Sequence, residues 1–141
     1  MSFSVEPSSS LSATVVFMAH LGLCAAYIQG GIVKLTDFPG AIDEMRRFRL
    51  APPAMFAVLV IALELLASAM ILTGFLRWLG ALALAGFTLL STLIALRFWE
   101  QPEGETRQAA ANAFFEHFGL AGGLVLAAWL DLVRNASPNV W

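Results

Sequence analysis

The side chains best able to do chemistry are polar residues within or beside long apolar runs, namely Glu64, His117, Lys34, Glu116, Gln29, Tyr27 and Arg97. Glu64 lies near the centre of residues 55–75, a run that contains no other charged residue. A charge at such a depth in a bilayer costs about 3 kcal/mol on insertion scales, so this carboxyl should face protein, water or a counter-charge. Carboxyl and imidazole groups in an apolar site can donate a hydrogen bond and exchange a proton.

The composition places these residues in an integral membrane protein. Of the 141 residues, 59% are hydrophobic and 13% are charged, whereas soluble domains carry about 25% charged residues. The mean hydropathy is +0.77. The net charge of −2 and the lack of a basic stripe argue against a nucleic-acid partner. The one cysteine, Cys24, excludes an internal disulfide, and its apolar neighbours indicate a packing residue rather than a reactive thiol.

Four apolar segments are each long enough to cross the roughly 30 Å hydrocarbon core as a helix. They are residues 12–33, 54–75, 78–98 and 109–133. Between the first two, residues 41–50 have the spacing of a short amphipathic helix lying in the membrane interface. The sequence therefore predicts an all-α membrane protein, an antiparallel four-helix transmembrane bundle with a short interfacial helix between helices 1 and 2. It forms one domain, residues 12–133, with polar tails at 1–11 and 134–141.

The basic residues predict the orientation of this bundle. Arg77 and Arg134 fall on the side of the chain termini. The other basic residues fall on the side of the two longer connections and are Lys34, Arg46, Arg47, Arg49, Arg97 and Arg107. The positive-inside rule then puts the longer loops in the cytoplasm and both termini outside. Residues 1–10 contain no Lys or Arg, so we expect the first segment to remain as an anchor rather than act as a secretory signal.

The depths of the polar residues within their helices bring them together. At 1.5 Å per residue, Glu64 lies roughly 15 Å from the bundle end that carries the longer connections, and Glu116 and His117 lie roughly 10 Å from it. The other four candidates fall in the same half of the bundle. Since all four helices contribute, the sequence predicts a polar site in that half.

Other interpretations of the same residues stay open. Lys34 and Arg97 could extend to the lipid headgroups instead of entering a site. Glu64 could be a neutral acid bonded to a backbone carbonyl, with a role in packing. Glu116 could face a cavity together with His117, or face Arg97 across the bundle.

The sequence gives little support for a metal, haem or autonomous catalysis. His20 lies roughly 12 Å from the opposite face, so its depth differs from that of His117 by roughly 8 Å in an antiparallel pair. A haem held by both imidazoles needs them at similar depth, which disfavours haem. No cluster has metal-ligand spacing, and no nucleophile–base pair or phosphate-binding loop is readable. An accessory role is favoured over an autonomous enzyme.

Short motifs along the chain resemble those of a known family. They are Gly31-Ile-Val-Lys34, Ala51-Pro52, Leu63-Glu-Leu-Leu-Ala67, Gly74-Phe-Leu-Arg77, Phe98-Trp99 and Ala121-Gly-Gly123. In this order and spacing they resemble the DoxX family of small bacterial membrane proteins, from about residue 14 to 130. The resemblance implies a four-helix, multi-pass protein of the bacterial cytoplasmic (inner) membrane.

The resemblance also implies a link to redox chemistry. The family is named after a subunit associated with thiosulfate:quinone oxidoreductase. Relatives are linked to thiol and oxidative-stress redox systems, and more distant ones look like cargo receptors or assembly chaperones. Lys34, Glu64 and Arg77 match the family and carry over. Many members have Arg in place of His20 and Lys-Asn in place of Glu116-His117, so no anion site inferred from those cations is carried over.

The leading functional hypothesis is a membrane subunit or small-molecule-binding bundle linked to quinone or thiol redox chemistry, with a quinone as the candidate cofactor. Glu64 and His117 would bond a quinone-like head group, and Lys34, Gln29 and Tyr27 would line the opening of the site. The expected partners are the lipid bilayer and either a redox-enzyme subunit or a second copy of the chain.

Two other functional classes stay open. The chain could be a scaffold or assembly chaperone that holds a partner membrane protein through residues 41–50. It could instead be a transporter of a small solute or of protons. A transporter needs a path from Glu64 to the outer face, where His20 is the one obvious intermediate group.

Overall fold

The computed structural model describes residues 9–137, and almost all of them are helical. The elements in chain order are α1 (Ser9–Thr36), α2 (Phe38–Arg47), α3 (Pro53–Thr73), α4 (Arg77–Ala95), the 3-10 helix η1 (Phe98–Glu100) and α5 (Glu105–Ala136). The helices α1, α3 and α5 and the stretch Arg77–Glu100, which comprises α4 and η1, are long and apolar enough to cross a membrane. The structure therefore confirms an all-α fold with four membrane-length helices and a short helix after the first.

The outer helices are longer than the apolar segments that predict them. α5 has 32 residues, which corresponds to about 48 Å at 1.5 Å per residue and exceeds the roughly 30 Å hydrocarbon core. α1 likewise begins at Ser9, within the predicted polar tail. Polar residues at both ends of a long helix can lie among the headgroups, so an apolar segment underestimates the helix that contains it. Residues 1–8 and 138–141 of the two predicted tails lie outside the described residues.

Capping and turn residues set the helix boundaries. Asp37 caps α2, and its carboxylate accepts a hydrogen bond from the backbone N–H of Gly40 at 3.1 Å. α3 begins at Pro53, where a missing backbone N–H removes no helical hydrogen bond. It ends at Gly74, which adopts the left-handed conformation (φ 81°) and donates its N–H to the carbonyl of Met70 at 3.0 Å. A short hairpin then leads directly into α4.

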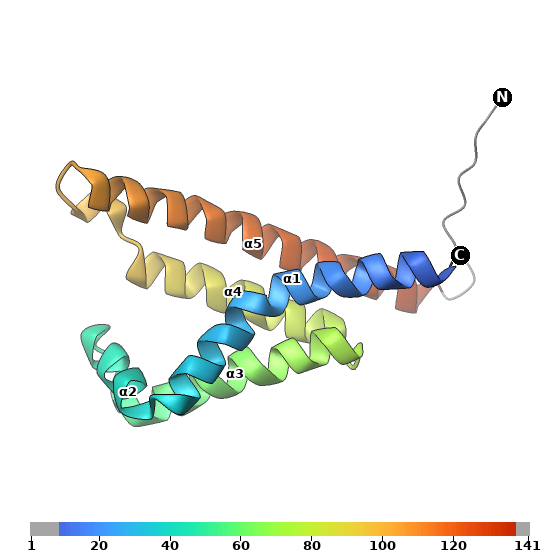
Figure 1. The fold of residues 1–141 in the computed structure, drawn as a ribbon, viewed down its shortest axis with the longest axis horizontal. Coiled ribbons are helices and arrows are strands. Elements are labelled where there is room, and N and C mark those ends of the chain that lie inside the picture. Colours follow the sequence, from blue (N-terminus) through green and yellow to red (C-terminus); the bar gives the residue numbers. More distant parts are fainter. Residues whose placement is uncertain (1–8, 138–141) are drawn as a thin grey trace.

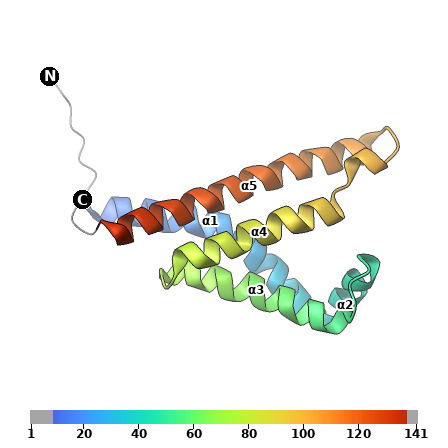
Figure 2. The same ribbon diagram turned by 180° about the vertical axis from the view of Figure 1, so that it is seen from behind.

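The long helices pack in the order α1, α3, α4, α5, each antiparallel to its neighbour (Figures 1 and 2). The start of α1, the α3–α4 hairpin and the end of α5 lie at one end of the molecule, and α2 and the α4–α5 connection lie at the other. From the hairpin, α3 and α4 separate toward the α2 end. α1 approaches α5 near Leu23, which contacts the position of Gly123. The α2 half of the molecule is therefore the more open half.

The core lies in the hairpin half, where small residues allow close approach. Its buried members are Cys24, Tyr27, Ala67, Ile71, Ala81, Leu84, Ala85, Leu124 and Ala128. A Cβ at Gly80 would lie 2.8 Å from the backbone carbonyl oxygen of Ala67, so α4 meets the backbone of α3 there. Tight packing at small residues is the main attractive force between helices in lipid.

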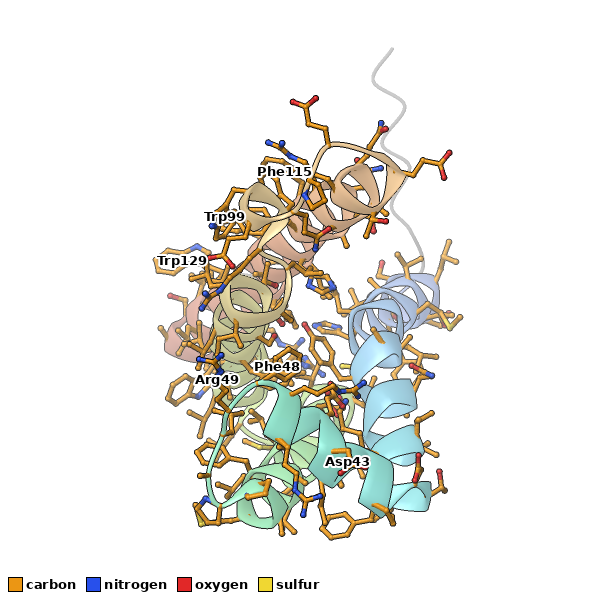
Figure 3. All side chains as sticks on the ribbon, turned by 90° about the vertical axis from the view of Figure 1, so that its left-hand side faces the viewer. Asp43, Phe48, Arg49, Trp99, Phe115 and Trp129 are labelled. Atoms are coloured by element: carbon orange, nitrogen blue, oxygen red, sulfur yellow. The ribbon has the colours of Figure 1, made fainter. Side chains whose placement is uncertain are left out.

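α2 packs on the bundle through one face. Ala41 and Met45 of α2 are buried against Ala57 of α3. In Figure 3, which views the molecule from the α2 end, Phe48 points toward α4, and Asp43 lies on the outer side of α2. The predicted amphipathic character is thus used for packing against α3.

A partly buried ion pair links the hairpin to α5. The guanidinium of Arg77 lies 3.8 Å from the carboxylate of Asp131, and its Nε donates to the carbonyl of Ile71 at 2.8 Å. The same carboxylate accepts a hydrogen bond from the backbone N–H of Trp78 at 3.2 Å, in the first turn of α4. Asp131 therefore has two partners: a backbone N–H that would be free at the start of α4, and the partly buried guanidinium of Arg77.

Candidate functional site

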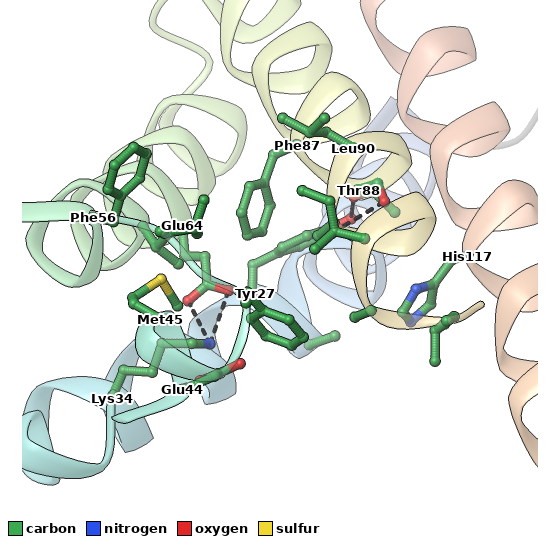
Figure 4. Close-up of a pocket in the computed structure, with 18 residues that line it drawn as sticks. Tyr27, Lys34, Glu44, Met45, Phe56, Glu64, Phe87, Thr88, Leu90 and His117 are labelled. Atoms are coloured by element: carbon green, nitrogen blue, oxygen red, sulfur yellow. Dashed lines mark hydrogen bonds and ion pairs between the residues drawn. The ribbon is translucent and has the colours of Figure 1, made fainter. Parts of the chain in front are cut away.

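A cavity of about 430 Å³ lies in the α2 half, between the α1–α2–α3 group and the α4–α5 pair (Figure 4). Every helix contributes to its lining, which is mostly apolar. The lining residues are Ala26, Tyr27, Lys34, Glu44, Met45, Phe48, Leu50, Phe56, Val60, Glu64, Phe87, Thr88, Leu90, Ser91, Ile94, Ala95, Leu96 and His117. A volume of this size, with a few polar groups among apolar walls, is typical of a small-molecule site.

An ion pair between α1 and α3 forms one side of the cavity. The ammonium of Lys34 lies 3.3 Å from both carboxylate oxygens of Glu64, and the two side chains are 17% and 7% exposed. The helices can come this close because Gly31 has no side chain, and a Cβ there would lie 2.8 Å from the side chain of Leu65. Lys34 thus points to Glu64 rather than outward. An ammonium has three N–H donors, so at least one can face the cavity.

A pair of hydroxyl groups links α1 to α4 across the cavity. Tyr27 and Thr88, both buried, are hydrogen-bonded through their hydroxyl groups. Thr88 uses its own hydrogen in a bond to the carbonyl of Leu84 at 2.6 Å. Tyr27 is therefore the donor in the shared bond, and its oxygen can still accept a hydrogen bond from a ligand.

His117 lies on the side of the cavity opposite Lys34 and Glu64, with Tyr27 between them (Figure 4). Its Nδ1 lies 2.9 Å from the hydroxyl of Thr92, which is buried in α4. This bond fixes the imidazole ring and leaves Nε2 for a ligand. Polar groups thus face one another across an apolar space.

The structure separates the remaining three predicted site residues from the cavity. Gln29 and Glu116 are exposed, although each lies within two positions of a lining residue. Each residue of a helix is rotated by about 100° from the previous one, so neighbours in sequence need not share a face. Arg97 lies beyond the end of α4, is half-exposed and pairs with Glu100 at 3.3 Å. It does not face Glu116.

Three polar lining residues were missed by the sequence analysis, namely Glu44, Thr88 and Ser91. It also missed Thr92, which does not line the cavity but is hydrogen-bonded to His117. Thr88 and Thr92 are four residues apart in a mainly apolar helix, and this spacing places two hydroxyl groups on one face. That signal could have been found. Glu44 could not, because the pattern of α2 does not say which of its charged residues lies beside another helix.

The remaining reactive side chains lie apart from the cavity. The Nδ1 of His20 lies 2.7 Å from the carbonyl of Val16 in its own helix, and His20 does not line the cavity. Cys24 is fully buried in the core. Within residues 9–137, no group of three or more His, Cys, Asp or Glu side chains is placed to hold a metal ion.

The fold defines the class: a multi-pass α-helical membrane protein, with a cavity of small-molecule size between its helices. The sequence profile of the DoxX family matches residues 11–97, which is more than half of the chain. The chain belongs to the DoxX family. A search of curated proteins and a search of solved structures each returned no match.

The family match has a narrower extent than the resemblance suggested. It ends at Arg97, whereas the resemblance was expected to continue to about residue 130. Lys34, Glu64 and Tyr27 therefore lie inside the matched region, and His117 on α5 lies outside it. The cavity combines residues from the family region with one side chain from a helix beyond it.

Proposed function

We propose that this DoxX-family protein binds the polar head of a lipid-soluble molecule in the cavity, and that the ligand is of the quinone type. The observation that carries the proposal is the largely buried Lys34–Glu64 pair facing an otherwise largely apolar space of about 430 Å³. A buried charge pair in a membrane helix bundle is costly, and such residues usually serve binding or transport. The protein would act as a membrane subunit beside a redox enzyme.

The polar groups suit a ring with two oxygens at opposite ends. A quinone carbonyl accepts a hydrogen bond, which the ammonium of Lys34 and the Nε2–H of His117 can donate from opposite sides. The hydroxyl of the reduced ring donates instead, and the carboxylate of Glu64 can accept from it. Phe87 on α4 and Phe56 on α3 supply apolar surface for the ring. Reduction of a quinone takes two electrons and two protons. The electrons would come from the partner redox enzyme, and the protons would come from water, by way of the carboxyl of Glu64 and the imidazole of His117.

The test is an organic extract of the full-length protein purified in mild detergent, analysed by mass spectrometry beside its absorption spectrum. We expect a quinone in a stoichiometric amount. Loss of a hydrogen bond to a charged group costs about 1.5–3 kcal/mol, so Glu64→Gln should retain at least about tenfold less quinone than wild type. Loss of a neutral hydrogen bond costs about 0.5–1.5 kcal/mol, so His117→Ala should retain about twofold to tenfold less quinone. Glu116→Gln is the matched control, because Glu116 is exposed and neighbours His117 without lining the cavity.

Three results would count against the proposal. Wild-type protein that carries bulk phospholipid alone would remove the quinone assignment. Equal amounts of quinone in wild type and all variants would show that the ligand does not bind in this cavity. A Soret band in the absorption spectrum would identify haem and return attention to His20 and His117.

One observation favours a second function, that of a scaffold for a partner membrane protein. The outer face of α2 carries exposed charges at Asp43, Arg46 and Arg47, while Ala41 and Met45 hold the helix in place. Replacing the three charged residues by Ser leaves the packing face intact, whereas scrambling the whole helix would not. A defined protein that copurifies stoichiometrically with wild type and is lost from this variant would support the scaffold. If the partner protein still copurified with this variant, the outer face of α2 would not be its binding surface.

A further inference from the structure

One side of the cavity is formed by side chains that also face the surroundings of the bundle. Leu90 of α4 lines the cavity and is 61% exposed. Phe56 of α3 and Phe87 of α4, both half-buried, line the cavity beside it. Figure 4 shows Phe87 and Leu90 between α3 and α4, on the side away from Lys34. Both helices are membrane-length spans, so this side adjoins lipid.

We infer that a ligand reaches the cavity sideways from the lipid, through a lateral portal formed by Phe56, Phe87 and Leu90, and that its hydrocarbon tail stays there. The portal lies where α3 and α4 separate toward the α2 end (Figures 1 and 2). At the α2 end of the bundle, by contrast, the lining includes the charged residues Lys34 and Glu44. The apolar path is therefore through the side.

The volume of the cavity sets the class of ligand. At about 30 Å³ per water-sized group, 430 Å³ holds on the order of 14 non-hydrogen atoms. A substituted ring fits in that space, but a long tail attached to it must leave the cavity. In the portal the tail would exchange lipid neighbours for Leu90 and the two aromatic rings, which are equally apolar. The site thus suits an amphiphile with a compact polar head and a long hydrocarbon tail.

The identity of the head rests on the proposed function, whereas the portal rests on the exposed apolar lining. The test places the photoreactive residue p-benzoylphenylalanine at position 90 of the full-length protein, in membranes supplemented with decylubiquinone. Position 93 is the matched control, because Leu93 is 49% exposed on the same helix and does not line the cavity. Position 26 probes another exposed part of the lining, on α1. After illumination, the mass of the purified protein identifies what has been captured.

We expect decylubiquinone adducts at position 90 in at least about tenfold excess over positions 93 and 26. In a second measurement, made at equilibrium, Leu90→Trp should weaken binding of decylubiquinone about tenfold, because the indole takes the place of the tail. Binding of the same ring without a tail should stay within about twofold of wild type. Leu93→Trp should change neither. Capture mainly at position 26, or equal weakening of both ligands by Leu90→Trp, would overturn the portal.

The two proposals can fail separately. If no quinone adduct forms at any position, the quinone assignment fails. Adducts with endogenous molecules then test whether the portal exists. One defined amphiphile that is not a phospholipid, captured at position 90 alone, upholds the portal. The same phospholipid masses at positions 90 and 93 overturn it. If the head binds beside the ion pair, adding Glu64→Gln should abolish capture at position 90. Unchanged capture would uphold the portal and show that the head binds elsewhere in the cavity.

Discussion

Removing the ammonium of Lys34 leaves the carboxylate of Glu64 buried without its counter-charge. The charged atoms lie 3.3 Å apart, which corresponds to about 5 kcal/mol of attraction at an effective dielectric constant of about 20. Breaking a buried pair by deleting one partner costs about 3–5 kcal/mol. Since Lys34 is 17% exposed and some water reaches it, we expect Lys34→Met to lower the free energy of unfolding by about 3 kcal/mol.

Removing the carboxylate should cost less. In Glu64→Gln the ammonium of Lys34, in the last turn of α1, can extend to the headgroup region, so the loss should be about 1–2 kcal/mol. The double variant should lose little more than Lys34→Met alone, because the second change removes the group that the first leaves unpaired. The resulting coupling energy should be about 1–2 kcal/mol.

The assay is unfolding by sodium dodecyl sulfate in mixed micelles, followed by far-ultraviolet circular dichroism. Arg46→Met is the matched control: its partner Asp43 is closer, at 2.8 Å, but both side chains are 65% exposed. An exposed pair contributes little, so this change should stay within about 0.5 kcal/mol. A coupling energy below about 0.5 kcal/mol for Lys34 and Glu64 would refute the reasoning. The pair would then be no more desolvated than the surface pair.

Three further predictions use the same unfolding assay. Asp131→Ala should cost about 3 kcal/mol, because it leaves Arg77 and a helix-start N–H unpaired, while Asp131→Asn retains an acceptor and should cost about half of that. Gly80→Ala should cost about 1–3 kcal/mol, because its Cβ would overlap the backbone of α3, whereas Gly86→Ala meets nothing within 4 Å and should be neutral or stabilising. Tyr27→Phe should cost about 1 kcal/mol, because it removes the hydrogen bond that links α1 to α4.

Each of these comparisons can fail in a specific way. If Asp131→Ala and Asp131→Asn lowered the free energy of unfolding equally, the hydrogen-bond acceptor retained by Asn would contribute nothing to stability. If alanine at positions 80 and 86 had equal effects, α3 and α4 would be farther apart than the structure has them. No loss of stability in Tyr27→Phe would mean that the link between α1 and α4 is not formed in the membrane.

The sequence by itself determined the fold class and the need for a buried polar site. Four long, mainly apolar runs can satisfy their backbone in lipid only as helices, so the four spans could be read directly. The short hairpin made α3 and α4 antiparallel neighbours, and the cost of a charge at mid-membrane required a partner for Glu64. These conclusions depend on local composition and length, which the sequence states fully.

The tertiary structure decided which faces meet. In a membrane span both the lipid side and the core side are apolar, so the hydrophobic pattern does not identify the inner face. Leu84 is fully buried and Leu90 is 61% exposed, yet both are leucines in the same apolar run. The same ambiguity placed Gln29 among the candidate residues and hid Thr88. The separation of α3 from α4, which creates the cavity, depends on how whole helices pack and has no signature in either helix alone.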